Sequence, residues 1–385
     1  MNRQLKLLEY ALAGLTRRKG KNVALLLVYA FTIAALGSVL FLTDALRSEA
    51  RQTLDHAPEM VVQRISAGRH ELIPRSYATT IAQLPGVRQA TPRVWGYYYD
   101  ALVRANFTLM GVTEPETQIK DLQGQLPAAD NECAVGIGIA DIFGATIGDS
   151  LVLVDAHGKN RVFAISGIFS AHSALLTHDL ILMPEPALRA FFNLDPTVAT
   201  DIAVSIANPR EITTLAKKVR YHLPDTRPIS RSEILHTYDS IFNWRSGMMF
   251  AVSVAALIAF CILAWDKATG ISADEKREIG ILKAVGWNTG DVMAIKFWEG
   301  LILSLSAFLI GTIAAWLHVF VLGAPALTPI LKGWSVLFPP FSLQPVTDPY
   351  QILVLAFLTI APYLACTLIP AWKTAVTAPE QAMRS

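Results

Sequence analysis

The sequence contains few charged residues. Asp, Glu, Lys and Arg make up 17% of its 385 residues, whereas hydrophobic residues make up 52%. The formal net charge is +2, and no cluster of basic residues is interleaved with aromatic ones. Because nucleic acid is bound through such basic patches, we expect no nucleic-acid partner. The composition instead indicates a membrane protein.

Cysteine is also rare. The three cysteines are Cys133, Cys261 and Cys366, and no two of them form a CxxC or CxxCH motif. The sequence therefore offers no zinc motif and no haem-attachment motif. Cys261 and Cys366 fall in long apolar stretches, which leaves Cys133 alone outside them, so that no disulfide is expected there.

Enzyme motifs are missing as well. Lys follows Gly only at Gly20-Lys21 and Gly158-Lys159, without the earlier glycine and the following hydroxyl of a P-loop. The motifs HExxH and GxSxG, which mark metalloproteases and serine hydrolases, do not occur. We therefore expect a non-catalytic chain that holds no cofactor and no metal of its own.

Long apolar stretches are what the sequence does contain. Four windows without Asp, Glu, Lys or Arg occupy residues 23–43, 246–265, 300–323 and 350–372. About 20 apolar residues suffice for a helix to cross the ~30 Å hydrocarbon core of a bilayer. The sequence predicts four transmembrane helices, with bounds 23–43, 246–265, 297–323 and 350–372.

Basic residues indicate how these helices are oriented. Lys and Arg are concentrated before the first window and between the second and third, whereas Lys332 alone lies between the third and fourth. Since basic flanks stay in the cytosol, both termini and residues 266–296 are expected there. Region 44–243 and loop 324–349, which contains six prolines, are then expected outside.

The segments between the spans have their own patterns. Residues 1–22 predict a cytosolic amphipathic helix on the membrane surface, because leucines recur in it at helical spacing. Residues 373–385 form a cytosolic tail. Region 44–243 alternates runs rich in β-branched residues with helical segments, which predicts a mixed α/β domain. Strands are expected near 59–65, 94–99, 107–112, 150–154, 162–169, 180–183 and 201–206, and helices near 74–84, 136–143 and 208–223.

The expected fold class is therefore an α-helical membrane protein with four transmembrane helices plus a large extracytoplasmic mixed α/β domain. Two histidines six residues apart, His172 and His178, are expected to have ordinary surface or packing roles. His318 lies in the third span, where a polar side chain is costly in lipid, so it is expected to point inward or to lie near the outer interface.

Segment 266–296 is the most informative part of the sequence, and we call it the coupling segment. Ile279, Leu282 and Val285 recur at helical spacing in it, and charged residues occupy the opposite positions. Gly286 is expected to end this helix, and Asn288 is expected to begin the next one. An amphipathic helix could also lie on the membrane, but its nearly balanced charge favours a protein partner.

Two stretches resemble a known family. The run from Glu275 to Gly286, which continues as Lys-Arg-Glu-Ile-Gly-Ile-Leu-Lys-Ala-Val, resembles the signature that follows the second span of FtsX-like permeases. That superfamily includes MacB and the lipoprotein-releasing LolC and LolE. The tail, with Pro370-Ala371 and Pro379, resembles the family's C-terminal ending, although Met383 replaces a leucine.

The resemblance implies the permease subunit of an ABC transporter of the mechanotransmission type, with a MacB-like periplasmic core domain, in the bacterial inner membrane. Such subunits dimerise with a second copy or a paralogue and bind a separate ABC ATPase, which holds the ATP and magnesium. The coupling segment would dock in the ATPase, with Glu278, Ile279, Ile281 and Leu282 in contact. The full expected coupling set is Glu275, Lys276, Arg277, Glu278, Ile279, Gly280, Ile281, Leu282, Lys283 and Gly286.

The resemblance leaves three functions open. The first is release or efflux of a lipoprotein or another lipophilic cargo, in which a periplasmic adaptor could take part. The second is FtsX-like signalling, in which the outer domain controls a cell-wall hydrolase. The third is export of haem or another small hydrophobic molecule, which would give His318, Met248 and Met249 a role. The size of region 44–243 favours the first.

Overall fold

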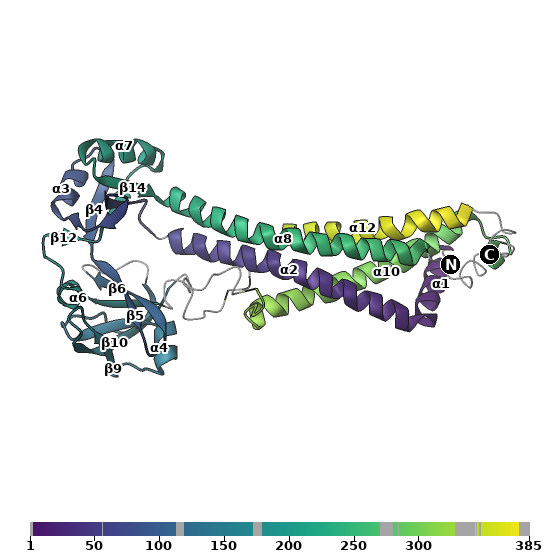
Figure 1. Cartoon of the computed structure of the whole chain (residues 1–385), viewed down its shortest axis with the longest axis horizontal. Helices are drawn as coiled ribbons and strands as arrows, with labels where there is room; N and C mark the ends of the chain where they lie inside the picture. Colours follow the sequence, from purple (N-terminus) through teal and green to yellow (C-terminus); the bar gives the residue numbers. More distant parts are fainter. Residues whose placement is uncertain are drawn as a thin grey trace. The chain divides into compact units, whose positions relative to one another are not determined.

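The computed structural model describes residues 3–55, 57–112, 119–171, 179–269, 280–283, 285–327, 343, 345 and 348–376. They form two compact units (Figure 1). The helical unit comprises the described residues of Met1–Ala45, Asn243–Leu331 and Pro345–Ser385. The α/β unit contains the described residues of Leu46–Phe242. Two helices have residues in both units, so the units are joined by continuous helical backbone.

Five helices provide the residues of the helical unit. They are α1 (Arg3–Arg17), α2 (Lys19–Asp55), α8 (Arg231–Thr269), α10 (Thr289–Trp316) and α12 (Pro349–Val376). A π-helical turn, Leu317–Val321, extends α10. In Figure 1 the apolar parts of α2, α8, α10 and α12 run alongside one another. α2 and α8 are much longer than the apolar windows that predicted them, and they are the two helices shared with the α/β unit.

Three of the described helices are long and apolar enough to cross a membrane. Their spanning parts are Lys19–Glu49, Thr289–Val321 and Pro349–Lys373. The second span expected from the sequence corresponds to a shorter apolar stretch of α8, Gly247–Ile262. Among the described residues, the expectation of four spans is therefore met for three, and the fourth remains a prediction.

Aromatic stacking joins three of these helices. The ring of Tyr29 on α2 lies 4.2 Å from the ring of Phe260 on α8 and 5.2 Å from that of Tyr363 on α12, measured between centroids. Its hydroxyl donates a hydrogen bond to the carbonyl of Thr359, so the buried polar atom is satisfied. Small residues bring α2 and α10 together, since a Cβ at Gly311 would lie 2.7 Å from the carbonyl oxygen of Ala30.

The first sheet of the α/β unit has five strands. Four of them follow the order β14 (Thr226–Ser230), β1 (Met60–Ser66), β13 (Asp201–Ile206), β4 (Val87–Arg93), and β2 (Arg69–Glu71) also pairs with β1. Helices α3 (Ser76–Ala82) and α7 (Ile212–His222) contact this sheet and share one apolar core with it. A 3₁₀ turn, Pro209–Glu211, precedes α7 and is capped by the side chain of Asn208, as the Asn-Pro pair predicts.

The second sheet has seven strands. Six follow the order β5 (Trp95–Asp100), β6 (Ala105–Val112), β11 (Leu180–Pro184), β8 (Glu132–Gly136), β10 (Asn160–Ala171), β7 (Ile119–Gly124), and β9 (Ser150–Val154) also pairs with β10. Every residue of β11 is buried. Because side chains alternate across a strand, Ile181 and Met183 join one core, and Leu180 and Leu182 join another. Helices α4 (Ile137–Phe143) and α6 (Glu185–Phe192) contribute to the first of these cores.

The structure confirms the mixed α/β character of this region. All seven predicted strands are present, with ends that differ from the expected ones by a few residues, and the three predicted helices are found as α3, α4 and α7. The prediction missed helix α6 and strands β4, β7, β8 and β14, together with three strands of two or three residues, β2, β3 (Ile73–Pro74) and β12 (Val198–Ala199).

A buried carboxylate holds the two sheets together where the chain passes from β4 to β5. Asp201 on β13 accepts hydrogen bonds from the guanidinium of Arg93 at 2.8 and 2.9 Å and from the indole of Trp95 at 2.9 Å. Its side chain is 2% exposed. The hydroxyl of Thr200 also bonds both the N–H and the carbonyl of Trp95. A second ion pair, Arg75 with Glu185 at 2.9 Å, links the N-cap residue of α3 to α6.

We expect Asp201→Ala to lower the free energy of unfolding of this unit by about 3 kcal/mol, because the half-buried donors of Arg93 and Trp95 would lose their buried, charged acceptor. The measurement is urea unfolding of residues 57–231, whose ends are adjacent because β1 pairs with β14, followed by far-UV circular dichroism. Asp130→Ala, at an exposed position, is the control. Equal midpoints for the two variants would contradict the assignment.

Asp155 gives this unit a predictable response to acid. The N–H of Lys159, together with the guanidinium of Arg161 and the N–H of His157, stabilises the charged carboxylate and lowers the pKa of Asp155 below its ordinary value, although burial opposes the shift. A carboxyl with a lowered pKa contributes stability above its unfolded pKa and loses it as the pH falls through the lower folded value.

We therefore expect Asp155→Asn to be less stable than the wild type at pH 7 and to lose less further stability on acidification. Urea midpoints of residues 57–231, measured between pH 7 and pH 3, would show this as a shallower slope. Parallel slopes for the two proteins would mean that the lowered pKa does not stabilise the fold.

Candidate functional site: the end of the helical bundle at the coupling segment

The structure describes part of the coupling segment. Five of the ten expected coupling residues, Glu275, Lys276, Arg277, Glu278 and Ile279, lie outside the described residues. The other five, Gly280, Ile281, Leu282, Lys283 and Gly286, are described. The site can therefore be built from Gly280 onward, where the segment turns into α10.

Gly286 ends the helix of the coupling segment. Its φ is +102°, a conformation that residues with a Cβ rarely adopt. The N–H of Trp287 donates to the carbonyl of Leu282, and the N–H of Gly286 donates to that of Lys283, both at 3.0 Å. This pair of bonds is the Schellman arrangement, which satisfies carbonyls that a helix end would otherwise leave open. The predicted C-cap is confirmed.

The next helix begins two residues later. The side chain of Asn288 accepts a hydrogen bond from the N–H of Asp291 at 2.9 Å, and the carboxylate of Asp291 accepts one from the N–H of Asn288 at 3.3 Å. This reciprocal capping box starts α10. The expected helix start is also confirmed, so a turn with both sides capped joins the short helix of the coupling segment to α10.

The end of α12 binds this turn directly. The ammonium of Lys283 donates to the carbonyl oxygen of Ala375, and the hydroxyl of Thr289 donates to the same oxygen at 3.4 Å. Ala375 is fully buried, and its side chain packs with Val292 of α10. The last carbonyls of a helix lack partners within the helix and attract positive charge, so Lys283 suits this position.

Helix α1 packs against the other side of the turn. Arg3 donates from Nη2 to both oxygens of Asp291, at 2.6 and 2.8 Å. The rings of Tyr10 and Trp287 lie 5.7 Å apart. Leu7 and Ala11 are buried against Ile295. The coupling segment, α1, α10 and α12 thus meet at one end of the helical unit.

Two apolar side chains of the coupling segment remain exposed. Ile281 is 51% exposed and Val285 is 75% exposed, while Leu282 is half-buried and Gly280 is buried. Positions four residues apart lie on the same face of a helix, so Ile281 and Val285 form one exposed apolar face. An exposed apolar helix face of this kind fits a hydrophobic groove on a partner protein.

The remaining candidate residues that the structure describes have separate surroundings. His318 bonds through Nδ1 with the hydroxyl of Ser38 at 3.0 Å, so it points inward, as expected for a polar residue in a span. Met248 is exposed on α8, and Met249 is half-buried. His172 and His178 lie outside the described residues. Within the described residues, no group of three or more potential metal ligands is present.

Sequence reasoning missed the contacts of the turn with α1 and α12. The only local signal was the pair Leu7 and Ala11, whose spacing of four residues predicts one buried helix face. Two of the leucines that recur at helical spacing in residues 1–22, Leu5 and Leu12, are exposed and so remain available to lipid.

Comparison with known proteins identifies the family. The family model of the MacB-like periplasmic core domain matches residues 24–221, which is more than half of the chain. The family model of the FtsX-like permease C-terminal domain matches residues 249–379, which include the coupling segment, α10 and α12. The chain belongs to the MacB/FtsX-type family of ABC transporter permeases. Membership of this family implies an ABC ATPase as a partner.

Solved structures resemble part of the chain. The periplasmic region of MacB from Actinobacillus actinomycetemcomitans is 15% identical, with a TM-score of 0.34, and the match covers 47% of this chain and 92% of that chain. The extracellular domain of the noncanonic ABC-type transporter YknZ from Gram-positive bacteria is 13% identical, with a TM-score of 0.31, and the match covers 44% of this chain and 98% of that chain.

We expect Gly286→Ala to loosen the turn, because alanine at a positive φ costs about 1 kcal/mol. Amide hydrogen exchange at residues 285–287 of the purified protein should accelerate on the order of fivefold. Gly247→Ala, at a position in α8 where an added Cβ meets no atom within 4 Å, is the control. Unchanged exchange in Gly286→Ala would mean that the cap does not hold the turn.

Proposed function

We propose that this chain is the permease subunit of a MacB/Lol-type ABC transporter and that its coupling segment is the surface to which the ATPase binds. The observation that carries the proposal is the exposed face of Ile281 and Val285, held on a turn that is capped at Gly286 and bound to α12 through Lys283. A rigid turn with an exposed apolar face can transmit force from a partner, whereas a loose loop would absorb it.

The chain connections support a mechanical role. The coupling segment joins α8 to α10, so displacing it moves the ends of two helices. Of these, α8 contains residues of both compact units, and α2 does so as well. ATP-driven closure of the ATPase would then be transmitted through α8 and α2 to the α/β unit. We propose that this unit lies outside the cytoplasmic membrane, with both termini in the cytosol, that all four predicted helices span, and that the permease acts as a dimer.

The cargo class that we propose is lipophilic: a lipoprotein, a lipid or a drug-like molecule, released or expelled on the outer face. The alternative is a signalling subunit whose moving outer domain controls a cell-wall hydrolase. Mass spectrometry of the proteins retained by the tagged wild-type chain distinguishes the two. An adaptor or lipoprotein alongside the ATPase supports transport, whereas a hydrolase alongside it supports signalling.

We expect Ile281→Asp to reduce co-purification of the ATPase by at least about tenfold, because a charge would replace an apolar side chain at the centre of the proposed contact. Glu278→Lys should have a similar effect by reversing a charge in the same segment. The measurement is a pull-down in mild detergent, with the amount of chain in the membrane fraction as the insertion control.

Leu102→Asp is the matched control, because Leu102 is an exposed leucine on the turn between β5 and β6 of the α/β unit. It should retain the ATPase at the wild-type level. If Ile281→Asp retained as much ATPase as Leu102→Asp, the coupling segment would not be the docking surface.

A further inference from the structure

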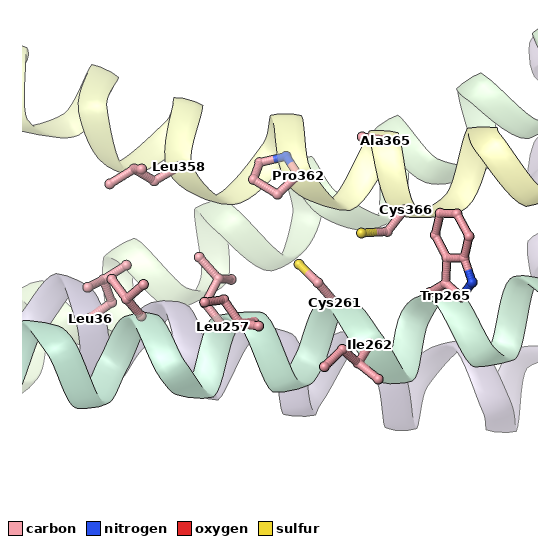
Figure 2. A pocket seen from close by; sticks show the side chains of 11 residues that line it. Leu36, Leu257, Cys261, Ile262, Trp265, Leu358, Pro362, Ala365 and Cys366 are labelled. Carbon is pink, nitrogen blue, oxygen red and sulfur yellow. The ribbon is translucent and has the colours of Figure 1, made fainter.

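An apolar cavity of ≈ 560 Å³ lies between α2, α8 and α12, within the helical unit (Figure 2). It is open on one side, because Ile258 and Ile262 of its lining are 56% and 63% exposed. Leu36 of α2 forms part of it, residues of α8 from Val254 to Trp265 form one wall, and residues of α12 from Leu358 to Cys366 form the other. Figure 2 shows Cys261 and Cys366 pointing toward one another from these two walls. All lining residues are aliphatic or aromatic, or are proline or cysteine.

The backbone of α12 helps to explain why the helices do not close this space. Pro362 lies inside α12 and lines the cavity. Its ring nitrogen cannot donate to the carbonyl of Leu358, which also lines the cavity, and its ring crowds the preceding turn. A helix bends at such a position. Ala365, which follows almost one turn later, fills little space.

The cavity extends toward the end of the bundle that carries the coupling segment. On α8 its lining reaches Trp265, close to the end of the helix at Thr269. On α12 it reaches Cys366, and Ala375 of the same helix contacts Lys283 of the coupling segment. Tryptophan is typical of the boundary between hydrocarbon and headgroups, so Trp265 indicates that the cavity reaches from the hydrocarbon up to that boundary.

The apolar lining of the cavity favours an apolar occupant. Water would find almost no hydrogen-bond partner in this cavity, and an empty space of this size would forfeit the van der Waals contacts of its walls. A hydrocarbon chain satisfies both conditions, and it is the solvent at this depth of a membrane.

A basic residue supplies the complementary charge for a headgroup. Lys373 follows Cys366 by seven residues, which is two turns or about 10 Å along α12, so helical periodicity places it near the same helix face, with the bend at Pro370 between the two residues. It is exposed, as is its neighbour Trp372. A lysine at this level attracts anionic phosphate.

We propose that the cavity binds one acyl chain of an anionic phospholipid from the leaflet beside the coupling segment, with the lipid phosphate at Lys373. The lipid is a bilayer component, and its binding site goes beyond the transport role proposed above. An acyl chain bound between α8 and α12 would pack against both helices. One of them leads to the coupling segment, and the other contains Ala375, which contacts it.

The test uses the full chain in vesicles of phosphatidylglycerol that carries a photoreactive diazirine at mid-chain. After irradiation, labelled peptides are quantified by mass spectrometry. We expect residues 254–265 and 358–366 to be labelled several-fold more than residues 305–316 of α10, which also expose apolar side chains. Ala365→Phe should lower the label to the level of α10, whereas Ala314→Phe, at an exposed alanine of α10, should leave it unchanged.

The headgroup contact is tested separately, with a variant that leaves the cavity intact. Lys373→Gln should reduce labelling by phosphatidylglycerol toward that by phosphatidylcholine, and Lys373→Arg should restore the difference. Uniform labelling of all apolar helices in the wild type would overturn the proposal, as would unchanged labelling in Ala365→Phe. Cross-links from the cavity residues to a second copy of the chain would also overturn it. None of these readouts requires the ATPase, so they are independent of the proposed coupling role.

Discussion

The hydrogen bond from Lys283 to the carbonyl of Ala375 is the contact on which the proposed mechanism of the helical unit depends. It joins the coupling segment to the last turn of α12, where carbonyl groups lack partners within the helix. Thr289 and Val292 of α10 contact the same residue, and Arg3 of α1 binds Asp291 in the first turn of α10. A force applied to the coupling segment would therefore reach α1, α10 and α12 as well as α8.

The α/β unit also depends on one polar contact, which is made by a buried carboxylate. Asp201 is buried and receives three hydrogen bonds from Arg93 and Trp95, which lie on either side of the passage from one sheet to the other. Each sheet has its own apolar cores, which fix the strands within it but not the sheets to one another. The polar contacts of Asp201 and Thr200, together with the ion pair of Arg75 and Glu185, join the two sheets within one compact unit.

Local sequence patterns predicted the elements whose ends or composition depend on neighbouring residues, such as helix caps and long apolar helices. Gly286 and Asn288 define a helix end and a helix start by themselves, and three of the four apolar windows coincide with described helices that are long and apolar enough to cross a membrane. The missed strands β4 and β14 contain Pro92 and Pro228, which argue against strands in a sequence. The structure places both strands at the edges of their sheet, where a missing N–H is tolerated.

Contacts between distant residues could not be predicted in the same way. Nothing near Ala375 in the sequence indicates that it meets Lys283, and nothing near Asp201 indicates that it meets Trp95, because these pairs form only when whole elements pack together. The same holds for the cavity, whose lining comes from three helices. The family signature predicted a role for the coupling segment, whereas only the structure shows that Ile281 and Val285 are exposed while Lys283 bonds to α12.

The central claim is that an ABC ATPase binds the coupling segment. The most direct test places a photoreactive amino acid at position 281, 285 or, as a reference, 102, and irradiates intact cells. The account predicts that the chains modified at positions 281 and 285 form an adduct with an ATP-binding-cassette protein, whereas the chain modified at position 102 does not. Adducts with lipid alone at positions 281 and 285 would contradict it and would make the segment a membrane-surface helix.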